Sequence, residues 1–305
     1  MVTRIGSNYN LVLMDMNIRR AREEHSRAAE PLASNQKINH LRDAPSRISE
    51  FFRLQNSLKR NEQYYLNINT ARTRVNLTDA VLIQATDVAN QVYELALQGN
   101  DQSLNTTQVT AITDRLSNLY DEMKDLANSK FGDTYLFSGF EASTIPFVNS
   151  GGNPPMNFQG DTNNVSIQVS ATRSVQVSLN GDYYFTGDAA GAATTVDVFN
   201  TIDDLITDIT NRDETNIATR ITAVQDILDQ FSGARSKLGN AMQQLDSTES
   251  MLETMELADT ERLSVLSETD LAEATTNLSF KEYVLETAFA VSRRIMDVSL
   301  KSFFN

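Results

Sequence analysis

Few side chains in this sequence are suited to catalysis or metal binding. It has no cysteine and only two histidines, His25 and His40, so thiolate chemistry and a histidine-based triad or metal centre are improbable. His25 falls at a core spacing, which favours a packed or rim position on a helix, and Glu23 and Glu24 beside it read as solvated residues. No phosphate-binding glycine loop, G-x-S-x-G or H-E-x-x-H motif occurs. We therefore expect no catalytic residue, no cofactor and no metal.

The other charged candidates have structural interpretations. Asp161, Asp182 and Asp188 lie in turn-rich sequence and are expected to be turn residues. Arg235 is different, because it falls at a core position of a predicted helix. Two interpretations stay open for it: a side chain that extends to solvent, and a buried or inter-subunit ion pair with an acidic helix.

The strongest pattern is an apolar stripe in the last 22 residues, VLETAFAVSRRIMDVSLKSFFN. A single chain could pair this stripe only with the early helix at residues 11–28, and two helices leave much of both exposed. An exposed apolar surface of that extent marks an interaction site, although a soluble helical core would show the same spacing. We predict a polymerisation interface formed by Leu11, Met14, Ile18, Ala21, Val284, Ala288, Val291, Ile295, Val298, Phe303 and Phe304.

The elements that position these residues follow from heptads and from the placement of glycine and proline. Apolar residues repeat at a 3–4 spacing through most of residues 46–126 and 217–252, which predicts long helices packed at shallow angles. Eight of the 12 glycines and three of the five prolines lie between Gly132 and Gly191. There VSIQV and VQVSL alternate with period two, and Asn180-Gly181 offers a tight turn.

The predicted fold is mainly α with a β-rich insert. It is an elongated rod of coiled-coil-like helices, with the N- and C-terminal helices paired and a small β domain at the far end. We divide the chain into a terminal polymerisation domain (1–43 and 260–305), a long-helix bundle (44–132 and 196–259) and a β-rich outer domain (133–195). Before assembly, both terminal arms are expected to be mobile and to fold on contact.

Charge is distributed unevenly, with a formal net charge of −14 at pH 7. Lys and Arg exceed Asp and Glu in residues 1–80, whereas acidic residues dominate 203–305, so the two ends can attract each other in a shared bundle. The basic excess is too dilute to predict nucleic-acid binding. No apolar run is long enough for a membrane span, and the N-terminus lacks a cleavable signal peptide.

The segment LASNQKINHLRDAPS (32–46) resembles the linker L-S-S-G-x-[KR]-[IV]-N-x-x-x-D-D-P of the bacterial flagellin family. It departs from that pattern at Ala44, and at Asn35, which replaces a glycine but tolerates a left-handed backbone. Pro31, just before the segment, should end or kink the first helix. The resemblance implies an interdomain linker that contains Lys37, Ile38, Asn39, Asp43 and Pro45.

Three further segments carry the resemblance. DTYLFSGFEASTIPF (133–147) is similar to the G-x-Y-[IL]-F-[AS]-G-[YF]-x-x-x-x-x-P-F segment of the branch that joins hook to filament, whereas true flagellins carry a variant around F-N-G. GARSKLGNAMQQLD (233–246) resembles the family's second long C-terminal helix, and residues 267–305 resemble its C-terminal arm.

The resemblance implies a structural flagellar protein outside the cell. Its implied partners are copies of itself in a ring, hook-associated protein 1, flagellin, a cytoplasmic export chaperone and the flagellar type III export apparatus. Two alternatives remain. One is flagellin itself, and the distant one is an enzyme or ligand-binding protein built on an elongated helical bundle.

Overall fold

The computed structural model describes residues 2–37, 47–152, 155–187 and 195–304. Its contacts divide the chain into two units, residues 1–60 with 254–305 (unit 1) and residues 61–253 (unit 2). Six α-helices carry most of the fold: α1 (Val2–Ser34), α2 (Ile48–Gly99), α3 (Thr106–Ala127), α4 (Val198–Asn211), α5 (Glu214–Ser267) and α6 (Leu271–Phe304). Among the described residues, no helix is both long and apolar enough to cross a membrane.

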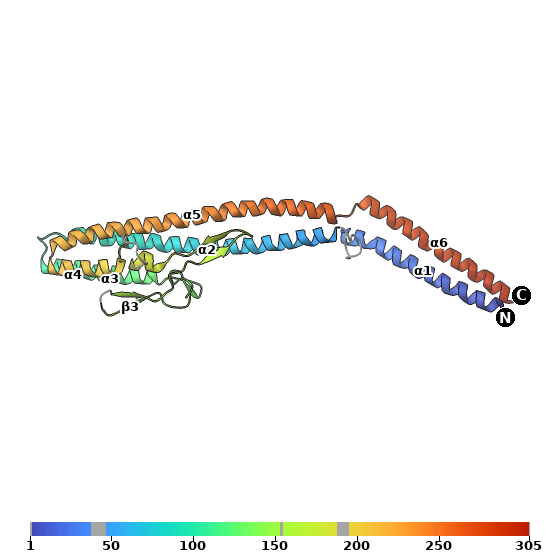
Figure 1. The fold of residues 1–305 in the computed structure, drawn as a ribbon, viewed down its shortest axis with the longest axis horizontal. Helices are drawn as coiled ribbons and strands as arrows, with labels where there is room; N and C mark the ends of the chain where they lie inside the picture. The colour runs from blue at the N-terminus through green and yellow to red at the C-terminus, as the bar shows by residue number, and fades with distance from the viewer. Residues whose placement is uncertain (1, 38–46, 153–154, 188–194, 305) are drawn as a thin grey trace. The chain divides into compact units, whose positions relative to one another are not determined.

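Unit 1 is built on α1 and α6, which lie side by side with both chain ends at the same end of the pair (Figure 1). Near its other end, the chain after α1 meets the end of α5, where the Lys37 amide donates to the Ser267 carbonyl over 2.6 Å. Asn35 has a φ of 54°, which confirms that asparagine occupies a left-handed position where the linker pattern has glycine.

Proline does not end the first helix. Pro31 lies inside α1, which continues to Ser34, so the prediction that the helix ends there was wrong. The proline ring removes one hydrogen bond to the preceding turn, but only three residues follow it in the helix. The missing bond therefore falls where helix ends already have unpaired groups.

Unit 2 contains the apolar core. Residues of α2, α3, α4 and α5 that the heptads place inside are buried, including Leu82, Leu116, Leu205 and Phe231. Two ion-pair clusters join α2 to α5 in opposite senses: Arg72 pairs with Asp246 (2.8 Å) and with Glu249, and Arg235 pairs with Asp79 (2.8 Å).

The segment between α3 and α4 forms three antiparallel hairpins, as the composition predicts. Their strands are β1 (Lys130–Phe131) with β2 (Thr134–Tyr135), β3 (Phe147–Asn149) with β4 (Met156–Phe158), and β5 (Ser166–Gln168) with β6 (Ser174–Gln176). In the last hairpin Ile167 is paired with Val175. This hairpin contacts both long helices, because Asn67 of α2 donates to the Gln168 carbonyl and Arg173 donates to Thr248 of α5.

Asn180-Gly181 does not make the expected hairpin turn. The Asn180 side chain accepts a hydrogen bond from the Asp182 amide and begins a short π-helix, η1 (Asp182–Thr186). The aromatic residues of that helix then turn inward, and Phe185 packs edge-on against Phe137 and Phe147. Burial of these rings outweighs the local turn preference.

Candidate functional site

Small side chains form the seam between α1 and α6. Ala21 and Ala28 of α1 and Ala274 and Ser292 of α6 are all buried. Small residues at facing positions let the backbones of two helices approach closely, and the larger apolar side chains are then displaced to the flanks of the seam.

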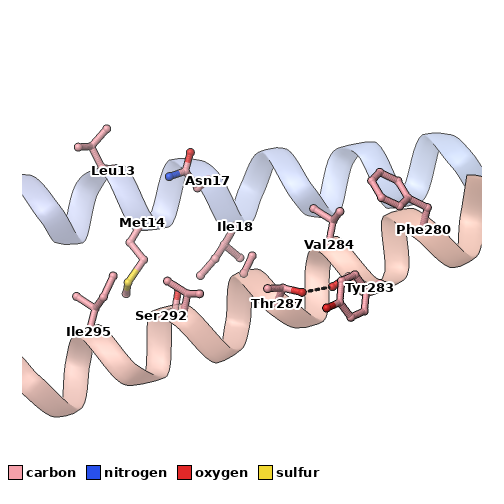
Figure 2. A pocket seen from close by; sticks show the side chains of 12 residues that line it. Leu13, Met14, Asn17, Ile18, Phe280, Tyr283, Val284, Thr287, Ser292 and Ile295 are labelled. Carbon is pink, nitrogen blue, oxygen red and sulfur yellow. Dashed lines mark hydrogen bonds between the residues drawn. The ribbon is translucent and has the colours of Figure 1, made fainter.

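Those larger side chains form a groove along the pair. Met14 and Ile18 point from α1 toward α6, and Ile295 points toward Met14 (Figure 2). The groove has a volume of about 760 Å³. It is lined by Leu13, Met14, Asn17, Ile18, Phe280, Tyr283, Val284, Thr287, Ala288, Val291, Ser292 and Ile295.

The groove is open to solvent along α6. Val291 is 52% exposed and Ile295 is 41% exposed, and the aromatic rings of Phe280 and Tyr283 are exposed further still. The Ser292 side chain is buried in the groove, and its hydroxyl has no hydrogen-bond partner. An open apolar groove of this kind fits an apolar helix face better than a small polar ligand.

Polar contacts nearer the other end of the helices fix how they align. The Lys281 ammonium lies 2.9 Å from Glu24, and the Arg22 guanidinium lies 5.2 Å from the centre of the Phe289 ring. The hydrogen bond from Lys281, with its charge, lowers the pKa of the Glu24 carboxyl. Glu24 is therefore an inter-helix contact, and the expectation that it is merely solvated was wrong.

Both helices of the groove lie in segments that match known family models. The bacterial flagellin N-terminal helical region matches residues 5–142, and the bacterial flagellin C-terminal helical region matches residues 221–304. The chain belongs to the bacterial flagellin family. The N-terminal match includes the groove residues of α1, and the C-terminal match includes those of α6.

Relatives within the flagellin family place the chain near its hook-associated members. It is 23% identical to flagellar hook-associated protein 3 of Escherichia coli over 287 residues, which is 88% of each chain. The fold is shared with a putative flagellar hook-associated protein from Vibrio parahaemolyticus (TM-score 0.67, 18% identity, covering 74% of this chain and 100% of that one). It is also shared with the flagellar junction protein FlgL of Legionella pneumophila (TM-score 0.55, 14% identity, covering 65% and 99%).

The structure brings most of the predicted interface residues together. Met14, Ile18, Val284, Ala288, Val291 and Ile295 all line the groove. Ala21 instead lies buried in the seam, where a second protein would not reach it. The side chains of Leu11, Val298, Phe303 and Phe304 fall outside the described part of the chain.

The linker residues are mostly outside that part too. Ile38, Asn39, Asp43 and Pro45 are not among the described residues. Lys37 is exposed, and its ammonium lies 4.0 Å from a carboxylate oxygen of Glu273 at the start of α6.

The sequence reading missed the aromatic end of the groove. Phe280 lies four residues before Val284 and therefore continues the apolar stripe by one step. Extending the same period toward the N-terminus would have included it. Ser292 gives no such signal, because a buried serine in a helix is indistinguishable in sequence from an exposed one.

Arg235 does not occupy the core position that the heptads assigned to it. The neighbouring Ala234 is fully buried, and Arg235 faces outward to pair with Asp79 of α2. The ion pair is therefore half-exposed and within one chain. Within the described ranges, no group of three or more acidic or histidine side chains is arranged to hold a metal ion.

Proposed function

We propose that this flagellin-family chain is the subunit of the junction between the flagellar hook and the filament, and that it assembles through the groove between α1 and α6. The observation that carries the proposal is the open groove, which exposes apolar side chains of both helices. The names of the related E. coli and Legionella proteins support the assignment to the junction. The function proposed is structural, and no catalytic role is part of it.

Burial in the groove would supply free energy for assembly. Complete burial of a large apolar side chain is worth roughly 1.5–3 kcal/mol, and Phe280, Tyr283, Val291 and Ile295 are each more than two-fifths exposed. Their partial burial would therefore contribute several kcal/mol per contact. Association costs on the order of 4–15 kcal/mol in lost freedom, so a ring with two neighbours for each subunit is stable where a single pair is weak.

The partners we propose follow from the family. Copies of the chain would form a ring outside the cell, with hook-associated protein 1 on the hook side and flagellin on the filament side. A cytoplasmic chaperone would cover α6 before the type III apparatus exports the chain without cleaving a signal. The three-domain division at 43/44, 132/133, 195/196 and 259/260 and the mobility of both arms before assembly remain parts of this proposal.

Val291→Asp tests the role of the groove in flagellated cells that lack their own copy of the gene. It places a charge at a half-exposed groove position, where the free chain tolerates it but a docked helix does not. We expect a folded, exported protein that no longer enters the flagellum, with filament-less hooks and flagellin shed into the medium. Ser279→Asp is the matched control, because it adds the same charge at an exposed position of α6 outside the groove.

Normal filaments with Val291→Asp would contradict assembly through the groove. Immunogold labelling of the unmodified chain separates the junction from the flagellin alternative: a narrow band at the hook tip is expected, and label along the filament would favour flagellin. Absence of label from the flagellum would refute both.

A further inference from the structure

The outer hairpins of unit 2 expose one aromatic side chain on a rigid loop. Phe140 is 62% exposed, although the three residues Leu136, Phe137 and Ser138 just before it are fully buried. Gly139 directs it outward, with a φ of +67°, and a Cβ at this position would overlap the carbonyl oxygen of Asp161. Only glycine fits there, so the backbone holds Phe140 in solvent.

Hydrogen bonds fix the same loop on both sides. The Tyr135 amide donates to the Ala142 carbonyl over 2.8 Å, and the Asp161 amide donates to the Ser138 carbonyl over 2.9 Å. A rigid exposed aromatic ring loses little entropy when it docks, which is why such residues dominate binding energy at protein interfaces. We call Phe140 the knob.

Unit 2 also has an apolar pit where α2 turns into α3. Its volume is about 530 Å³, and its lining consists of Leu97, Gln98, Asp101, Leu104, Gln108, Ala111 and Ile112. Leu97 is half-exposed. The walls are preformed, because Asn105 and Gln108 cap α3 reciprocally and Arg212 donates to the Leu104 carbonyl over 2.9 Å.

We infer that the Phe140 knob of one chain docks into the α2–α3 pit of a second copy. Phe140 and Leu97 both remain exposed within the single chain, so the contact would be between chains. Two other cavities of unit 2 suit an aromatic ring less well, because one is lined by Asp226, Asp229 and Lys237 and the other by Asp182 and Asp197. The pit offers leucine, isoleucine and alanine instead.

The size of this contact explains why it needs an assembly. One aromatic side chain buries roughly 150–250 Å², whereas stable protein pairs bury about 1,200–2,000 Å². The contact is therefore too small to hold two free chains, and it rests on the proposed function to bring copies together. Because knob and pit are different surfaces, the contact is head-to-tail, which generates a ring or a helix rather than a closed pair.

The absence of cysteine makes disulfide trapping a clean test. Glu141→Cys lies beside the knob and Gln98→Cys lies on the pit, and both positions are exposed, so knob and pit stay intact. The two full-length variants are co-expressed in flagellated cells that lack the natural gene, and isolated flagella are oxidised. We expect a disulfide-linked dimer only when both cysteines are present. Adding Phe140→Ser to the Glu141→Cys chain should reduce that dimer about tenfold or more.

The controls separate this contact from the proposed function. If both variants reach the hook tip but do not crosslink, the knob-and-pit contact is wrong while the junction assignment stands. A dimer of Glu141→Cys with itself, or with Val291→Cys in the unit 1 groove, would show that Phe140 docks elsewhere. Crosslinking that persists with Phe140→Ser would remove the knob from the contact. If the cysteine-free chain itself does not localise to the hook tip, the junction assignment fails, and this contact falls with it.

Discussion

Asp197 should make unit 2 less stable as the pH rises. Its side chain accepts a hydrogen bond from the Asn200 amide over 2.9 Å and so caps α4. Burial raises the pKa of the Asp197 carboxyl from 3.8 to about 6, and the nearby carboxylates of Asp204 and Asp182 raise it further, against the effect of the capping amides. The charged form is therefore disfavoured in the folded state.

The size of the effect follows from that pKa. A rise of about 2 units corresponds to roughly 3 kcal/mol, at 1.36 kcal/mol per unit. Because the folded pKa is above the unfolded one, the stabilising contribution is fully present below pH 3.8 and is lost as the pH rises through about 6. At pH 7.5 the folded state carries the whole cost of the buried charge.

Asp197→Asn removes the charge and keeps the cap, because asparagine is as good at a helix N-cap as aspartate. We expect the variant to be more stable than the wild type by about 2–3 kcal/mol at pH 7.5 and nearly equal to it at pH 4. The measurement is the urea midpoint of α4, read by pulsed hydrogen exchange with mass spectrometry at both pH values.

Asp197→Ala is the matched control. It also removes the charge but loses the cap, so it should be less stable than Asp197→Asn by about 1 kcal/mol at either pH. A wild-type chain whose advantage over Asp197→Asn is the same at pH 4 and pH 7.5, or grows with pH, would refute the argument from burial.

Two further predictions test single contacts. Glu24→Lys should weaken α1–α6 pairing at low salt, seen as faster amide exchange in α1, and adding Lys281→Glu should restore it; since the pair is partly exposed, about 1 M salt should remove the difference. Gly139→Ala should cost at least ~2 kcal/mol more in thermal unfolding than Gly151→Ala, because both have positive φ but only Gly139 is closely packed, and equal losses would count against that packing.

Helices and their inward faces could be predicted because one period describes both. The proline-free stretch from 46 to 99 predicted one long helix, and α2 runs from Ile48 to Gly99. Met14 and Ile18 fall on the face of α1 that meets α6, as their spacing indicates. Such agreement follows from the fixed geometry of the helix, which needs no knowledge of the rest of the fold.

Contacts between distant segments could not be predicted in this way. Glu24 and Lys281 are 257 residues apart, and their pairing depends on how far one helix slides along the other, which neither heptad encodes. Arg235 shows a second limit. Over several turns the 3.6-residue period drifts from a strict heptad, and that drift is enough to place Ala234 inside and Arg235 outside.

The open groove is a consequence of pairing only two helices. A helix pair has one seam, and in unit 1 the buried positions of that seam include Ala21, Ala28, Ala274 and Ser292. Bringing the backbones close through these small residues leaves no room between them for Phe280 and Tyr283. Those rings would need a third surface to be buried, and the two paired helices cannot provide one. Replacing the seam alanines with leucine would separate the helices and alter the groove, so close packing inside the pair and an apolar surface outside it follow from the same residues.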